Sequence, residues 1–181
     1  DVKAVGIYSA AVKLCEAWYF LPTAVMASLF PAILEVRKIS KGLYEERIQK
    51  LYDLLIWGAL AVALPTTLLA DWVIYIFYGV DFQEAAEVLK MYIWAGVFVS
   101  LGVVSSKWLI TENLERYSLY ITLFGAILNI VFNLYLIPIY GIRGAAIATL
   151  ISYGTASYLS LAIFKKTRDN FWVATNALNP Y

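Results

Sequence analysis

Residues 117–164 read YSLYITLFGAILNIVFNLYLIPIYGIRGAAIATLISYGTASYLSLAIF and carry one charged side chain, Arg143. A helix needs about 20 mostly apolar residues to cross the hydrocarbon core of a bilayer. A transmembrane β-strand would need only about ten, with an alternation of polar and apolar residues that this stretch lacks. The proline and glycine of residues 138–141 (PIYG) divide the stretch near its middle. We therefore predict two membrane-spanning helices, over residues 117–139 and 142–164, joined by a tight turn.

Three more apolar stretches of this kind precede that pair, over residues 5–34, 54–77 and 88–110. The first is longer than one span requires, so we expect it to tilt, to bend at Pro22 or to leave one end outside the hydrocarbon. The chain of 181 residues is 62% hydrophobic and 15% charged, against roughly 45–50% and about 25% in a soluble domain. The predicted fold class is therefore all-α, a polytopic membrane helix bundle with about five transmembrane helices.

Composition also excludes several classes of function. The net charge of +1 provides no basic field for nucleic acid, so we expect no nucleic-acid partner. Histidine is absent, and a single cysteine, Cys15, permits neither an internal disulfide nor a paired-cysteine metal site. No Walker A, GxSxG or HExxH motif occurs. We expect no enzyme activity, no catalytic residue, no metal site and no cofactor. The composition does not determine whether a coupling ion, Na⁺ or H⁺, is used.

Basic residues are unevenly distributed among the connections. Ten of the 14 Lys and Arg residues lie between the first two spans, at the end of the third span or between it and the fourth, or after the fifth: Arg37, Lys38, Lys41, Arg47, Lys50, Lys107, Arg116, Lys165, Lys166 and Arg168. Because cytoplasmic loops carry an excess of Lys and Arg, the N-terminus of this chain is expected outside and its C-terminus in the cytoplasm. We predict a multi-pass protein of the cytoplasmic (inner) membrane, with a membrane domain over residues 1–165 and a cytoplasmic tail over residues 166–181.

Residues 41–53 are predicted to form an amphipathic cytoplasmic helix. Tyr44, Ile48 and Leu51 fall on one face, and charged residues cover much of the rest. This helix either lies on the membrane surface and runs directly into the second span, or packs on the bundle as a connecting helix.

Lys13 and Glu16 are ionisable residues inside the first span, three apart and therefore on one helical face. Burying a lysine in lipid costs on the order of 2.5–3.5 kcal/mol on insertion scales. Trp18 and Tyr19 follow, deeper than residues of an interfacial aromatic belt. These four residues are candidates for the wall of a water-filled substrate cavity. The alternatives are a buried ion pair and extension of the Lys13 side chain to the outer surface.

Asn129 and Asn133 are amide side chains in the fourth span. They lie four residues apart and so share one face of the predicted helix. Such side chains usually bond to a neighbouring membrane helix, and the alternative is a role in lining the cavity.

Small residues form a stripe on the fifth span. Gly144, Ala148, Ser152 and Ala156 recur every four residues, and Gly141 begins a second row beside them. Residues of this size and spacing let two helix backbones approach closely. We assign these five residues to helix packing and expect the stripe to support docking of another part of the protein.

Several motifs together resemble one known group of transporters. They are residues 6–11 (GIYSAA), 21–22 (LP), 29–31 (LFP), 78–79 (YG), Phe82, 85–86 (AA), 128–129 (LN), Asn133 and 136–149 (LIPIYGIRGAAIAT). In this order they resemble the polysaccharide exporters and lipid-linked oligosaccharide flippases of the MATE-like (MOP) superfamily. The pattern LNxxxN…IPxYGxxGAAIAT is fairly specific to that group, whereas the other pieces are individually weak.

The resemblance implies one lobe of a two-lobe transporter. Members of the family have about a dozen helices in two six-helix lobes around a central cavity, and this chain is similar to the C-terminal lobe without its first helix. The chain begins at Asp1 with no initiator methionine and no signal peptide, so we expect it to be a piece of a longer protein. The expected partners are the lipid bilayer and the missing N-terminal lobe, or another copy of the chain.

The resemblance also implies a substrate and a mechanism. Family members flip polyprenyl-linked glycans across the cytoplasmic membrane by alternating access, which implies that Lys13 meets the phosphate and that Glu16 pairs with it or responds to a coupling ion. The alternatives are another MATE-like exporter, of cationic drugs or of peptidoglycan precursors, and, from other classes, a non-transporting membrane subunit or a polyprenyl-sugar enzyme. A cationic cavity would favour lipid phosphates, and an acidic cavity would favour cationic drugs.

Overall fold

The computed structural model describes residues 2–178, which fold into helices and contain no strand. In chain order the elements are α1 (Val2–Trp18), α2 (Phe20–Arg37), α3 (Lys41–Tyr78), η1 (Val80–Phe82), α4 (Ala85–Tyr92), α5 (Ala95–Thr111), α6 (Glu115–Tyr140), α7 (Ile142–Gly154), the π-helical η2 (Thr155–Leu159), α8 (Ser160–Ile163), η3 (Lys165–Thr167) and α9 (Arg168–Leu178). Within this part of the chain, five helical segments are long and apolar enough to cross a membrane: Val2–Arg37, Lys41–Tyr78, Ala85–Thr111, Glu115–Tyr140 and Ile142–Ile163. The predicted all-α bundle of five spans is confirmed.

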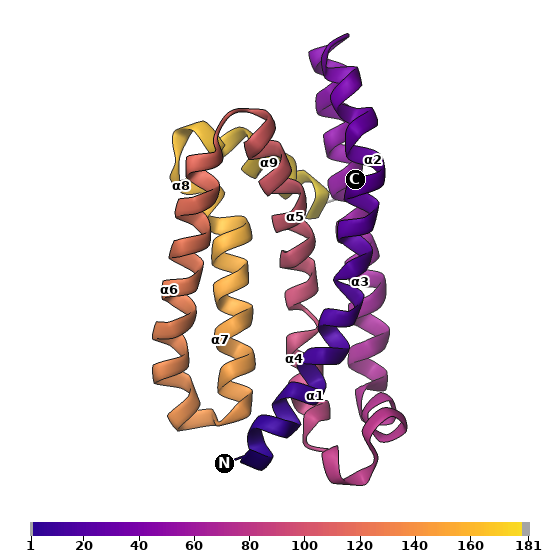
Figure 1. Ribbon diagram of the computed structural model, residues 1–181, viewed down its shortest axis with the longest axis vertical. Helices are drawn as coiled ribbons and strands as arrows, with labels where there is room; N and C mark the ends of the chain where they lie inside the picture. Colours follow the sequence, from indigo (N-terminus) through magenta and orange to yellow (C-terminus); the bar gives the residue numbers. More distant parts are fainter. Residues whose placement is uncertain (1, 179–181) are drawn as a thin grey trace.

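Consecutive segments run in opposite directions along the long axis (Figure 1). The α1–α2 and α3 segments lie on one side, α4–α5 in the middle, and the α6–α7 hairpin on the other side. Two hydrophobic clusters hold them together. One joins α1, α4 and the second half of α3 through residues such as Ala11, Leu89 and Ala70, and the other joins α2, the first half of α3, α5 and α9.

The first span is broken rather than smoothly bent. Helix α1 ends at Trp18 and α2 begins at Phe20, and the Tyr19 amide donates to the Glu16 carbonyl (3.0 Å). A proline ring clashes with the carbonyl four residues earlier, which for Pro22 is that of Trp18. The bend expected at Pro22 therefore lies one turn earlier, at Tyr19. The third span also breaks, at residues 93–94 between α4 and α5.

The segment predicted to be amphipathic forms the start of α3, which continues without interruption to Tyr78. Ser40 caps this helix by accepting a hydrogen bond from the Leu43 amide (3.4 Å). Tyr44, Ile48 and Leu51 are buried against α2 and α9. The structure therefore has a feature of each expected arrangement: the segment runs directly into the second span, and its apolar face packs on the bundle because neighbouring helices cover it.

Most of the segment expected to be a tail is a packed helix. Asn170, Ala174 and Ala177 are buried on one face of α9, which crosses the end of the bundle and contacts α3 (Figure 1). The buried Tyr52 hydroxyl donates to Asn170 Oδ1 (2.8 Å) and shares a hydrogen bond with Ser105 Oγ (2.7 Å). Residues 179–181 lie outside the described part of the chain. Asn170, Ala174 and Ala177, spaced four and three apart, provide a face that α3 covers, and the hydrogen bond from Tyr52 satisfies the buried amide oxygen of Asn170.

Replacing Tyr52 with phenylalanine is expected to lower the free energy of unfolding by about 1.5 kcal/mol, because Asn170 Oδ1 and Ser105 Oγ lose their shared partner inside the protein. The measurement is unfolding in mixed micelles, followed by circular dichroism, together with proteolysis of the C-terminal helix. Tyr135→Phe is the matched control, since Tyr135 is 70% exposed on α6. Equal effects of the two changes would contradict the prediction.

Candidate functional site

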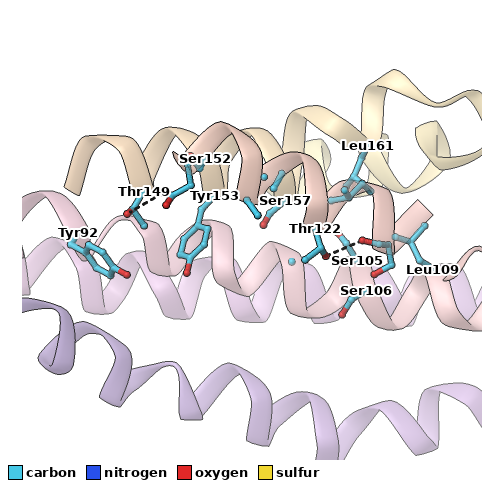
Figure 2. Close-up of a pocket in the computed structure, with 17 residues that line it drawn as sticks. Tyr92, Ser105, Ser106, Leu109, Thr122, Thr149, Ser152, Tyr153, Ser157 and Leu161 are labelled. Atoms are coloured by element: carbon cyan, nitrogen blue, oxygen red, sulfur yellow. Dashed lines mark hydrogen bonds between the residues drawn. The ribbon is translucent and has the colours of Figure 1, made fainter. Parts of the chain in front are cut away.

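A cavity of about 510 Å³ lies between α5, α6 and the α7–η2 segment, with Tyr92 of α4 at one end (Figure 2). Nine of its 17 lining residues carry a hydroxyl group, Asn129 carries an amide, and none is charged. Figure 2 shows Tyr153 and Ser157 between Tyr92 at one end and Leu161 near the other, so the cavity is elongated along the helices. We call it the hydroxyl cavity.

Seven of the nine hydroxyl groups of this cavity fall into two sets, and the other two, those of Ser105 and Ser106, hydrogen-bond to the Tyr52 hydroxyl and the Val103 carbonyl. Thr122, Thr149 and Ser152 donate to the carbonyl four residues earlier in their own helices (2.9, 3.0 and 2.7 Å), which satisfies them within the helix. Four others make no hydrogen bond within residues 2–178: those of Tyr92, Ser118, Tyr153 and Ser157. These four come from three different spans, and they are the groups that a bound molecule can engage.

Aromatic side chains gather at the Tyr92 end. The Tyr8 and Tyr92 rings meet edge to face with centroids 6.2 Å apart, and Trp18 and Tyr19 pack against the hydrophobic cluster that contains Tyr92. Within the described residues, the Tyr19 hydroxyl and Trp18 Nε1 are buried without a hydrogen-bond partner. The structure thus brings two of the predicted cavity residues, Trp18 and Tyr19, to this aromatic cluster.

Lys13 and Glu16 do not form the ion pair considered as an alternative to a cavity role. In the described part of the chain no salt bridge joins them, both side chains are exposed, and neither lines the hydroxyl cavity. The cause is the packing of α1, which buries the face that carries Ala11 and Cys15 and leaves Lys13 and Glu16 outside.

Asn129 combines the two roles considered for the amide pair, whereas Asn133 has neither. Asn133 Nδ2 donates to Asn129 Oδ1 (2.9 Å), and Asn129 Nδ2 donates to Thr149 Oγ1 of α7 (3.5 Å). Asn129 also lines the hydroxyl cavity, whereas Asn133 does not. One amide therefore joins two helices and faces the cavity at the same time.

The small-residue stripe lies against α6. Gly144 packs on the backbone of Leu136, and an added Cβ on Gly125 would lie 2.7 Å from the Cβ of Ala156. Ala148 and Ser152 are buried in the same interface. This face is thus covered within the chain, so the expectation that the stripe docks another part of the protein is wrong.

Gly141 is not a packing residue, which corrects its assignment. It is exposed, no atom lies within 4 Å of the position that a Cβ would take, and its φ is +58°. Glycine adopts this backbone conformation at little cost. Gly141 therefore serves the turn between α6 and α7.

Among the residues that line the hydroxyl cavity, the sequence patterns indicated only Asn129 as a cavity residue. A signal was present, because Ser118, Thr122, Gly125 and Asn129 recur at intervals of four, three and four residues in an otherwise apolar span. That spacing places small and polar side chains on one helical face. Among residues 2–178, no three His, Cys, Asp or Glu side chains gather as metal ligands would.

Comparison with known proteins relates the chain to one family. The MatE family model matches residues 42–135. The chain is 33% identical to the "Probable flippase AglR" of Haloferax volcanii over 176 residues, which cover 92% of this chain and 36% of that protein. It is 24% identical to the "Probable low-salt glycan biosynthesis flippase Agl15" of the same organism, over 86% of this chain and 33% of that protein.

A third relative is the "Uncharacterized membrane protein MJ1375" of Methanocaldococcus jannaschii, which is 29% identical over 81% of this chain and 34% of its own length. The chain therefore spans about a third of the length of the curated relatives that it matches. No solved structure is a significant match to the chain.

Proposed function

Because this chain belongs to the MatE family, we propose that it is part of a transporter that flips a polyprenyl-linked oligosaccharide across the cytoplasmic membrane by alternating access. Two of the relatives are named as flippases, and one of those names refers to glycan biosynthesis. In this proposal the chain supplies five spans, with its C-terminus in the cytoplasm. A second lobe, from the same protein or from another copy, completes the central cavity.

The observation that carries the proposal is the neutral lining of the hydroxyl cavity. Sugars present many hydroxyl groups, each of which both donates and accepts hydrogen bonds, and the unpaired hydroxyls of Tyr92, Ser118, Tyr153 and Ser157 can do the same. Aromatic faces next to the cavity add the apolar surface on which a sugar ring can pack. A site for cationic drugs would instead need a carboxylate, and none lines this cavity.

Lys13 and Glu16 are exposed ionisable side chains of α1. Exposed ionisable side chains on a membrane span are costly unless they meet water or a partner. We assign them to the face of this lobe that completes the central water-filled cavity, where Lys13 meets the substrate phosphate. Glu16 then pairs with Lys13 or responds to a coupling ion.

The test is glycan export in source cells whose gene for this protein carries the double change Tyr153→Phe and Ser157→Ala. Two lost hydrogen bonds of about 0.7 kcal/mol each correspond to an export rate about tenfold lower. The readouts are the glycan mass on a surface glycoprotein and the accumulation of lipid-linked precursor. Tyr135→Phe with Ser28→Ala makes the same chemical changes at two exposed positions and is expected to leave export unchanged.

Both variants must reach wild-type levels in the membrane. Normal export by the Tyr153→Phe, Ser157→Ala protein would then contradict a role for the cavity in glycan transport. Loss of cationic dye efflux with normal glycan export would favour the drug-exporter alternative.

A further inference from the structure

A second pocket, of about 450 Å³, lies where the chain passes from α5 to α6, at the basic end of the bundle. It is lined by Asn113, Leu114, Glu115, Arg116, Tyr117 and Lys166. Arg116 belongs to the first turn of α6, and Lys166 to η3, fifty residues later. We call it the basic pocket.

The two cations of the basic pocket are not neutralised by the protein. Arg37, Lys50 and Lys90 each have a carboxylate oxygen within 3.0 Å. Arg116 and Lys166 have no ion pair within residues 2–178, although Glu115 also lines the pocket. The N-terminal end of the 26-residue α6 adds the positive end of the helix dipole. Two cations and one carboxylate leave the basic pocket with a net positive charge, which favours the binding of an anion.

Two contacts hold the elements that carry these cations in fixed positions. The Tyr117 ring packs on the Phe164 ring with centroids 5.1 Å apart, which ties the start of α6 to the segment that precedes Lys166. Asn113 has a φ of +57°, and the next amide, that of Leu114, donates to the Leu109 carbonyl (2.7 Å). The α5–α6 loop is therefore closed by its own hydrogen bonds.

The lining residues of the basic pocket are close in sequence to those of the hydroxyl cavity on all three elements that enclose the pocket. On the α5 side the lining passes from Leu109 of the cavity to Asn113 of the pocket, and on α6 Ser118 of the cavity follows Tyr117 of the pocket. On the third element it passes from Leu161 to Lys166. The basic pocket therefore lies close to the Leu109 and Leu161 end of the uncharged hydroxyl lining.

We propose that the basic pocket is a phosphate-binding site, in which Arg116 and Lys166 hold the phosphates of a lipid-linked glycan while its sugars enter the hydroxyl cavity, at a stage of transport before the phosphates meet Lys13 in the central cavity. The part concerning the glycan rests on the proposed function. Arginine recognises phosphate oxygens with paired N–H groups, and lysine adds a point charge. The basic pocket lies at the end of the membrane spans, the level at which the phosphates of a bilayer-anchored lipid stand.

The binding test uses the full chain in nanodiscs of neutral phosphatidylcholine, titrated with inorganic pyrophosphate by calorimetry. We expect saturable binding, with a Kd about tenfold higher for Arg116→Gln and for Lys166→Gln. The control is Lys165→Gln, which removes the same charge from the adjacent residue outside the pocket and is expected to change Kd less than twofold. Absence of saturable binding, or an equal loss in Lys165→Gln, would overturn the site.

A second arm separates the two sources of phosphate. The titration is repeated in nanodiscs that contain anionic phosphatidylglycerol. Unchanged pyrophosphate binding supports a carrier-lipid phosphate, whereas its loss assigns the pocket to bulk lipid headgroups and overturns the glycan part. If binding depends on Arg116 and Lys166 while the Tyr153→Phe, Ser157→Ala protein exports glycan normally, the phosphate site stands and the proposed function fails.

Discussion

Replacing Gly144 with alanine is expected to lower the free energy of unfolding by about 3 kcal/mol, at the upper end of the range for overpacked interiors. An added Cβ would collide with the carbonyl group of Leu136 and would lie 3.0 Å from the Ile137 amide nitrogen. These are backbone atoms of α6, so no change of side-chain rotamer relieves the clash. The turn at Gly141 holds α6 and α7 together only a few residues away, and the two helices must therefore separate.

The measurement is the unfolding free energy in mixed micelles, together with the fraction of protein that elutes as a single species. Gly58→Ala is the matched control, because Gly58 lies inside α3 and has no atom within 4 Å of its Cβ position. Alanine there is expected to stabilise the helix by about 0.5–1 kcal/mol. Similar stability of the two variants would show that the close approach of α7 to Leu136 is not needed.

Replacing Gly96 with alanine is expected to cost about 2 kcal/mol of unfolding free energy. An added Cβ would lie 2.8 Å from Trp18 Nε1 and 3.3 Å from Tyr19 Cε1. Gly96 begins α5 just after the break at residues 93–94, and Trp18 and Tyr19 stand at the break between α1 and α2. The substitution therefore wedges apart two helix junctions that face each other.

A double-mutant cycle isolates this contact. With Trp18→Leu as the second change, the clash partner is removed, so the added cost of Gly96→Ala is expected to fall by at least about 1 kcal/mol. Gly6→Ala combined with Trp18→Leu is the control, since no atom lies within 4 Å of the Gly6 Cβ position. If the losses of unfolding free energy for Gly96→Ala and Trp18→Leu simply add, the cost of Gly96→Ala does not come from its contact with Trp18.

Local features of the chain determined the five spans and the turn between the last two. Each span must satisfy its own backbone hydrogen bonds in hydrocarbon and be long enough to cross it, and both conditions can be checked on a single segment. The turn at residues 138–141 depends on a proline and a glycine, whose backbone preferences are also local. Even the break after Trp18 follows from one proline, once the clash is placed four residues before it.

Only the tertiary structure decided which faces of those helices meet. The spacing of Lys13 and Glu16 permits an ion pair, but the packing of α1 on α4 leaves both side chains exposed. The small residues on α7 permit close packing against any helix backbone. The short turn at Gly141 places α6 next to α7, so α6 is the helix that they contact. Residues 168–178 became a packed helix because Tyr52, more than a hundred residues earlier, supplies the hydroxyl that binds Asn170.

The candidate site shows the same division. The sequence by itself established that the chain crosses the membrane, and it indicated Asn129 and the aromatic pair of Trp18 and Tyr19. It did not reveal that Tyr153 and Ser157 share a cavity with residues of α5 and α6, or that Arg116 and Lys166 line one pocket although they are fifty residues apart. A membrane span is a property of consecutive residues, whereas a cavity is a property of surfaces that meet after the chain has folded, and no local pattern specifies which surfaces those are.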